Sequence, residues 1–124
     1  MERRRLGRTG RQVSALGFGG AEIGYGHAPQ ATVDRLLDEA LDARLNVIDT
    51  AECYLDSETL IGRAVVHRRR EFYLLTTCGH DSGLGLPDWD PTLLTASIER
   101  RLERLRTDYL DVVQRNCSGG RALR

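Results

Sequence analysis

The sequence predicts an α/β fold in which helices cover a parallel β-sheet. Two observations lead to this prediction: short apolar runs alternate with segments of helical periodicity, and polar or glycine-rich residues follow three of those runs. This order favours right-handed crossovers between parallel strands. Functional residues in such sheets collect beyond the carboxyl ends of the strands. The length of 124 residues suits one domain, and no repeat or linker divides residues 1–124.

The chain begins with a predicted β-hairpin. Two short segments flank the tetrapeptide GRTG at residues 7–10, whose glycines can adopt the positive φ angles of a tight turn. A short apolar strand over residues 14–20 follows and ends in glycines. We interpret residues 21–30 as a loop that leads to the first helix.

Three amphipathic helices are predicted, over residues 31–43, 57–66 and 91–105. Each has an apolar inner face, and that of the first helix follows the i, i+3, i+4, i+7, i+8 spacing of a one-sided apolar stripe. The first stripe comprises Val33, Leu36, Leu37, Ala40 and Leu41, the second Leu60, Ile61, Ala64 and Val65, and the third Leu94, Ile98, Leu102 and Leu105. The third helix has Asp90 as its N-cap and Pro91 at its first position. On its outer face, Arg100 can pair with Glu103.

Three further apolar runs are predicted strands, over residues 45–49, 72–77 and 108–114. The first ends on a carboxylate, Asp49, and a phenol follows five positions later at Tyr54. Each residue alone is weak evidence, because an aspartate after a strand often caps the next turn. In a parallel sheet, however, both would lie on the rim that Gly19 and Gly20 also reach.

Composition excludes several classes of partner. Eighteen arginines balance eighteen acidic residues, and lysine does not occur. Zero net charge gives no electrostatic reason to expect nucleic acid or a membrane surface as a partner.

The three cysteines, Cys53, Cys78 and Cys117, form no CxxC pair, and with no secretory signal they predict reduced thiols in the cytoplasm. Together with His80 they match no local metal motif, so we expect no metal site.

Four segments, in order, resemble the aldo/keto reductases: RRLGRTGRQVSALGFGG, NVIDTAECY, SETLIGRAV and DYLDVVQ. The likeness runs from about residue 3 to residue 117. It implies NADPH-dependent reduction of aldehydes or ketones on a (β/α)₈ TIM barrel. Because a full barrel needs ~250 residues, residues 1–124 would form a partial domain, the first half of the barrel, with an N-terminal hairpin and about four β/α units.

The resemblance also implies a site. Asp49 and Tyr54 match the catalytic pair, in which the tyrosine protonates the carbonyl oxygen as hydride arrives from the nicotinamide. Gly19, Gly20 and Asp49 match cofactor contacts, but the resemblance also implies that most contacts with NADPH come from the second half of the barrel, which residues 1–124 do not contain. The family's catalytic lysine would fall at or beside Thr77, and its histidine at or beside Asn116. Neither group is present, and both a substitution and a deletion would explain each loss.

Loss of the lysine has a physical consequence. A neighbouring cation favours an ionised phenol, whereas a carboxylate without a cation opposes it. We therefore expect an NADPH-linked oxidoreductase that is impaired or inactive as this chain alone. The alternative is a non-catalytic, truncated relative that acts as an interaction or assembly module or has no function.

Four strands cannot close a barrel. We therefore expect a truncated reading frame, or a half that self-associates through its open sheet edges. A small carbonyl compound is the expected substrate if the protein is active.

Overall fold

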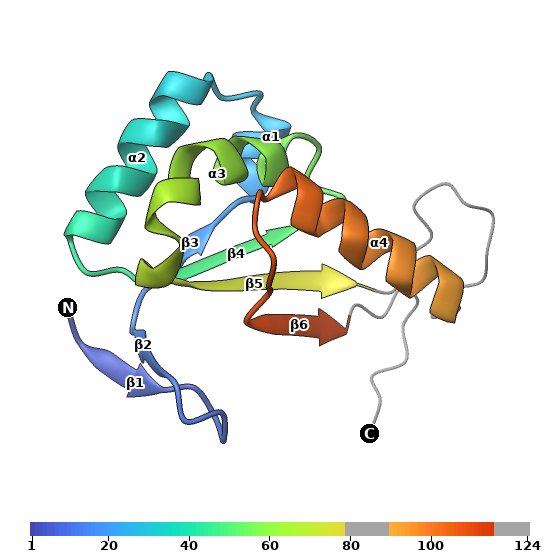
Figure 1. Cartoon of the computed structure of the whole chain (residues 1–124). Helices are drawn as coiled ribbons and strands as arrows, with labels where there is room; N and C mark the ends of the chain where they lie inside the picture. Colours follow the sequence, from blue (N-terminus) through green and yellow to red (C-terminus); the bar gives the residue numbers. More distant parts are fainter. Residues whose placement is uncertain (79–89, 116–124) are drawn as a thin grey trace.

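The computed structural model describes residues 1–78 and 90–115. It confirms the predicted α/β fold (Figure 1), in which a two-stranded antiparallel hairpin precedes a four-stranded parallel sheet of order β3-β4-β5-β6. The strands are β1 (Arg3–Arg5), β2 (Gln12–Ser14), β3 (Phe18–Gly19), β4 (Val47–Ala51), β5 (Tyr73–Cys78) and β6 (Val112–Arg115). The helices are α1 (Ala21–Tyr25), α2 (Gln30–Asp42), α3 (Ser57–Val65), the 3-10 helix η1 (Val66–Glu71) and α4 (Pro91–Arg104).

The hairpin turn follows the sequence prediction. Gly7 and Gly10 have φ angles of 51° and 76°, which glycine adopts at little cost. The Leu6 amide donates to the Arg11 carbonyl at 2.9 Å and closes the turn. Figure 1 shows the hairpin near the amino ends of β4 and β5, so it leaves the carboxyl ends of the strands free for a site.

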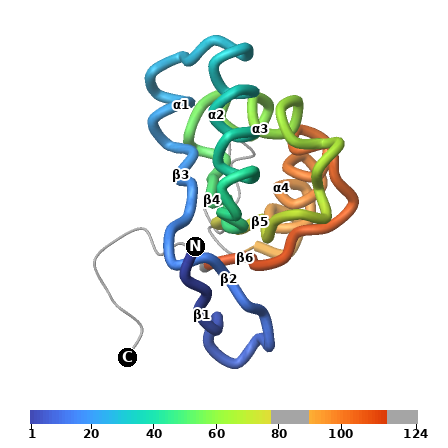
Figure 2. Tube along the Cα trace, turned by 90° about the vertical axis from the view of Figure 1, so that its left-hand side faces the viewer, coloured from blue at the N-terminus to red at the C-terminus, as the bar shows by residue number. Residues whose placement is uncertain are grey.

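The core lies between the sheet and the helices. Strand residues alternate between faces, and those facing the helices, Ile48 and Leu74 among them, are almost completely buried. They pack against apolar residues of α2 and α3, and α3 lies between α2 and α4 (Figure 2). Asp49 alternates with Ile48 and therefore faces the opposite side of the sheet.

Several predicted boundaries were wrong. Residues 21–30, interpreted as a loop, contain helix α1. The strand predicted over residues 45–49 instead spans Val47–Ala51, because Thr50 and Ala51 continue the ladder with Thr76 and Thr77. Asp49 is therefore inside β4, and the loop begins at Glu52. In α2, Leu36 was predicted to face the core but is 40% exposed. The buried apolar stripe of α2 is therefore narrower than the predicted one.

Helix α4 begins as predicted, but the face that it buries differs from the predicted face. The Asp90 carboxylate accepts the Thr92 amide at 2.9 Å, with Pro91 at the first helical position. Its buried face comprises Leu93, Ser97, Arg101 and Leu105, whereas the predicted Leu94, Ile98 and Leu102 are only partly buried. Periodicity alone could not indicate this face, because two of its four residues are polar.

Candidate active site

Strand β3 ends beside Asp49, two residues before the end of β4, so the carboxyl ends of the two strands lie close together. Gly19 is the register partner of Asp49. The Gly20 amide donates to the Asp49 carbonyl at 2.8 Å, so the ladder continues one residue beyond β3. The two glycines and the aspartate are thus immediate neighbours.

The Asp49 carboxylate has no positively charged partner among the side chains that the structure describes. It is partly buried, and its Oδ1 atom has no hydrogen-bond partner there. Burial raises the pKa of Asp49 above its ordinary value, because the charged form loses hydration. Among the side chains that the structure describes, which do not include that of Arg115, no ion pair involves Asp49.

Thr77 lies where a cation would reach this carboxylate. Asp49 pairs with Leu75, and Ala51 pairs with Thr77. Thr77 is therefore on the same sheet face as Asp49, one strand over and two residues further along, which places their Cα atoms ~8 Å apart. A threonine hydroxyl carries no charge, so the position supplies no counterion. Asn116, the second predicted loss, is outside the described residues.

Tyr54 stands in the loop that joins β4 to α3. Its amide donates to the Ala51 carbonyl at 3.1 Å, and its own carbonyl accepts the Ser57 amide at 3.1 Å. The Tyr54 ring meets the Tyr25 ring edge to face, with centroids 5.7 Å apart, a favourable geometry for aromatic pairs. The Tyr25 hydroxyl donates to the Cys53 carbonyl at 3.2 Å, so α1 holds this loop from one side.

Two glycines near this loop are required by packing. A Cβ atom on Gly24 would lie 1.8 Å from the Tyr54 carbonyl oxygen, and one on Gly20 would lie 2.5 Å from Ser57 Oγ. Ser57 in turn shares a buried 2.9 Å hydrogen bond with Thr50. Gly19 differs, because a Cβ there would meet no atom within 4 Å. The space beside Gly19 is open, as close approach by a ligand requires.

The sequence reasoning missed two parts of this region. Tyr25 was assigned to a loop, and Glu52 was not considered. The Glu52 carboxylate binds Ser97 and Arg100 of α4, and it also pairs with Arg101. The available signal was the spacing of Ser97, Arg100, Arg101 and Arg104, which places four polar residues along one side of a helix.

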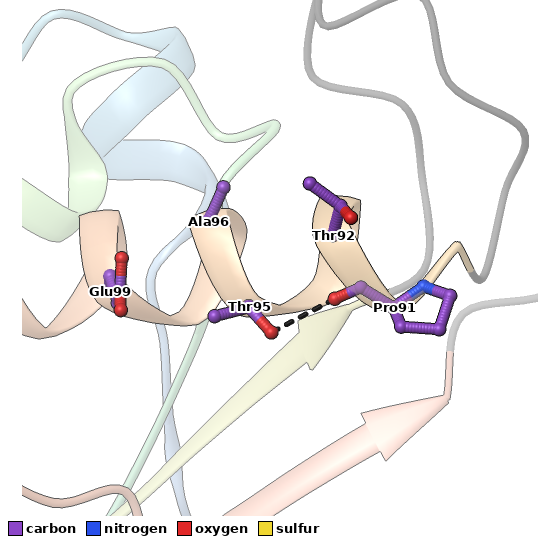
Figure 3. A pocket seen from close by; sticks show the side chains of 5 residues that line it. All are labelled: Pro91, Thr92, Thr95, Ala96 and Glu99. Carbon is purple, nitrogen blue, oxygen red and sulfur yellow. Dashed lines mark hydrogen bonds between the residues drawn. The ribbon is translucent and has the colours of Figure 1, made fainter.

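A separate depression of about 400 Å³ lies on the surface of α4. Figure 3 shows its lining, which comes from this one helix: Pro91, Thr92, Thr95, Ala96 and Glu99. The Thr95 hydroxyl donates to the Pro91 carbonyl at 2.9 Å (Figure 3). The lining includes neither Asp49 nor Tyr54, so the candidate site remains at the strand ends.

Among the side chains that the structure describes, no group of three histidine, cysteine or acidic residues is arranged to hold a metal ion. Cys53 is a free, exposed thiol. The Cys78 side chain, His80 and Cys117 are outside the described residues. No helix in the described ranges has both the length and the apolar character needed to cross a bilayer.

Comparisons with known proteins agree with this architecture. The aldo/keto reductase family model matches residues 15–119. Among curated proteins, the Bacillus subtilis oxidoreductase YqkF is 32% identical over 92% of this chain and 38% of its own. L-galactose dehydrogenase of Arabidopsis thaliana is 34% identical over 91% of this chain and 37% of its own. The chain therefore spans less than half the length of these relatives.

Solved structures give the same result. A Pseudomonas aeruginosa protein assigned to the aldo-keto reductases superimposes with a TM-score of 0.84 at 33% identity, covering 94% of this chain and 47% of its own. The holo form of a Bacillus halodurans aldo-keto reductase gives 0.79 at 33% identity, covering 93% and 40%. The parallel sheet thus corresponds to part of the (β/α)₈ barrel of these neighbours, and the chain belongs to the aldo/keto reductase family.

Proposed function

We propose that the protein acts in the NADPH-linked reduction of an aldehyde or a ketone, with Tyr54 as the proton donor. The observation that supports this most directly is the juxtaposition of Asp49 with Gly19 at the strand ends, next to the loop that carries Tyr54. Among the curated relatives, the Arabidopsis thaliana protein is named as a dehydrogenase of a sugar, L-galactose. A cytoplasmic location is part of the proposal, because an odd number of cysteines suits a reducing compartment.

The residues present suit one side of a nicotinamide site. Open space beside Gly19 allows a ligand to approach the backbone. Oδ1 of Asp49 has no partner within the described residues and can accept a hydrogen bond from a ribose hydroxyl. When bound, NADPH supplies a hydride. The Tyr54 hydroxyl would then donate its proton to the carbonyl oxygen and yield an alcohol.

A second function, without catalysis, is favoured by one specific observation. Thr77 lies on the same sheet face as Asp49 and carries no charge, so position 77 supplies no fixed positive charge to promote proton transfer from Tyr54. We therefore expect slow turnover at best from this chain alone. A binding or assembly role is the remaining candidate.

Titration and turnover assays distinguish the two functions. We expect NADPH fluorescence to respond to the purified chain, and we expect slow loss of NADPH absorbance with a simple aldehyde. Tyr54→Phe should reduce that turnover by about 10²–10⁴-fold, the usual contribution of a general acid, while NADPH binding persists. Binding without any turnover would favour the non-catalytic function, and no binding at millimolar NADPH would contradict the proposal.

We also propose that the sheet is extended by self-association. In the described order, β3 and β6 are the outer strands, and outer strands present unpaired backbone groups to other chains. Val113 of β6 is 42% exposed. A second copy would supply further parallel strands of matching geometry.

Light scattering over a range of protein concentrations tests this proposal. We expect a mass above that of the monomer, and we expect Val113→Lys to shift the equilibrium toward the monomer. The matched control is Leu36→Lys, which changes an equally exposed leucine on α2. A sharp monomer peak at all concentrations, with cooperative unfolding, would contradict self-association.

A further inference from the structure

The loop from Glu52 to Asp56 has few internal constraints. Cys53, Leu55 and Asp56 are exposed, and Leu55 adopts a φ of 51°, which is uncommon for a leucine. Among the described residues, the backbone of Tyr54 bonds to Ala51 and Ser57, which flank the loop. The position of the Tyr54 ring must therefore depend on contacts with other elements.

Glu52 joins this loop to helix α4. Its side chain is 12% exposed, and both carboxylate oxygens are engaged. Oε1 accepts from Arg100 Nε at 2.6 Å, and Oε2 accepts from the Ser97 hydroxyl at 2.9 Å. Arg101 and Arg104 add longer contacts at 3.5 and 3.6 Å. Charge-assisted hydrogen bonds of this kind are stronger than neutral ones.

The same arginines also hold the residue that follows the loop. Glu58, near the start of α3, is 1% exposed and pairs with Arg104 at 3.5 Å and Arg101 at 3.8 Å. Burial raises the pKa of the Glu58 carboxyl, an effect that the Arg101 guanidinium partly offsets. One face of α4 therefore binds a carboxylate on each side of Tyr54, and α1 contacts the loop from elsewhere through Tyr25.

We propose that Glu52 is a positioning residue for Tyr54, and that it acts by fixing the Tyr54 loop to α4 through Ser97 and Arg100. This inference rests on the proposed role of Tyr54 as proton donor. The family resemblance assigned no role to Glu52. The charged groups on α4 near the loop are Arg100, Arg101 and Arg104. Among the described residues, loss of the Glu52 carboxylate would leave Arg101 and Arg104 paired with Glu58, and Arg100 without the partner that it has in the wild type.

Hydrogen exchange and NMR measure the position of the loop without cofactor or substrate. In Glu52→Ala, we expect the amides of Tyr54 and Ser57 to exchange at least about tenfold faster, while β5 amides change by less than about twofold. We also expect the proton contacts between the Tyr25 and Tyr54 rings to disappear from the NMR spectrum. Glu52→Gln retains the shape but not the charge, so it should give an intermediate result. The control is Glu99→Gln, which changes an exposed glutamate of α4; its exchange rates and ring contacts should match those of the wild type.

Two results would overturn the inference. One is a folded Glu52→Ala variant that retains the ring contacts and the slow exchange of Tyr54. The other is faster exchange that is equal in the loop and in β5, because that indicates general destabilisation instead of positioning. If Glu52→Ala does not fold, Glu52→Gln and Ser97→Ala are judged by the same criteria. A failure to bind NADPH would contradict the proposed function but would leave these readouts unchanged.

Discussion

Gly24→Ala is expected to displace the Tyr54 loop and to lower the free energy of unfolding by about 1–3 kcal/mol, the usual cost of overpacking. The added methyl group would lie 1.8 Å from the Tyr54 carbonyl oxygen and 3.1 Å from Ser57 Cβ. Neither contact involves a flexible side-chain end, so α1 and the loop must separate. The carbonyl of Tyr54 also accepts the Ser57 amide, and separation would strain that bond.

Chemical denaturation and NMR of the Tyr25–Tyr54 ring pair test this expectation. The control is Gly19→Ala, which adds the same methyl group where no atom lies within 4 Å; its stability should stay within about 0.5 kcal/mol of the wild type. A Gly24→Ala variant as stable as Gly19→Ala, with its ring contacts intact, would show that the two segments are not held together as tightly as the geometry indicates.

Thr77→Lys is expected to restore the missing charge and to increase carbonyl reduction. The ladder places position 77 on the same sheet face as Asp49, and a lysine side chain can span most of the ~8 Å between their Cα atoms. An ammonium there would lower the pKa of Asp49, which burial raises in the wild type. It would also favour ionisation of a nearby phenol, and we expect turnover to rise by at least about tenfold. Unchanged turnover in a variant that binds NADPH would argue against this role for position 77.

Stability measured against pH provides an independent test of the same charge. In the wild type the raised pKa means that folded Asp49 binds its proton more tightly than unfolded Asp49 does. The contribution of Asp49 to stability therefore falls as pH rises from the ordinary value of 3.8 through the folded value. In Thr77→Lys the sign of this contribution should reverse, so that it rises with pH over the carboxyl range.

Asp49→Asn is the companion variant. It should be more stable than the wild type at pH 7 and equally stable at pH 3, where the aspartate is already largely neutral. Thermal unfolding of the three proteins at pH 3, 5 and 7 would measure these trends. A parallel pH dependence in the wild type and Asp49→Asn would show that Asp49 does not carry the effect.

Local chemistry made much of the fold predictable. The glycines of the hairpin turn, the Asp90 cap with Pro91, and the alternation of strands with amphipathic helices all depend on neighbours along the chain. The same is true of the rim, because parallel strands bring Gly19, Gly20 and Asp49 together wherever the sheet forms. Short segments of the sequence were enough to predict these features. They were not enough to predict every boundary, such as the end of β4.

The sequence by itself therefore determined the parallel α/β architecture, the family and the residues at the strand ends. Only the tertiary structure decided how those residues are held. Arg101 is buried because Glu52 and Glu58, more than forty positions away in the chain, reach the same face of α4. Tyr25 meets Tyr54 because α1 packs beside α3. Neither contact has a local signature, since a polar helix face or a lone tyrosine has the same pattern whether it faces water or a partner.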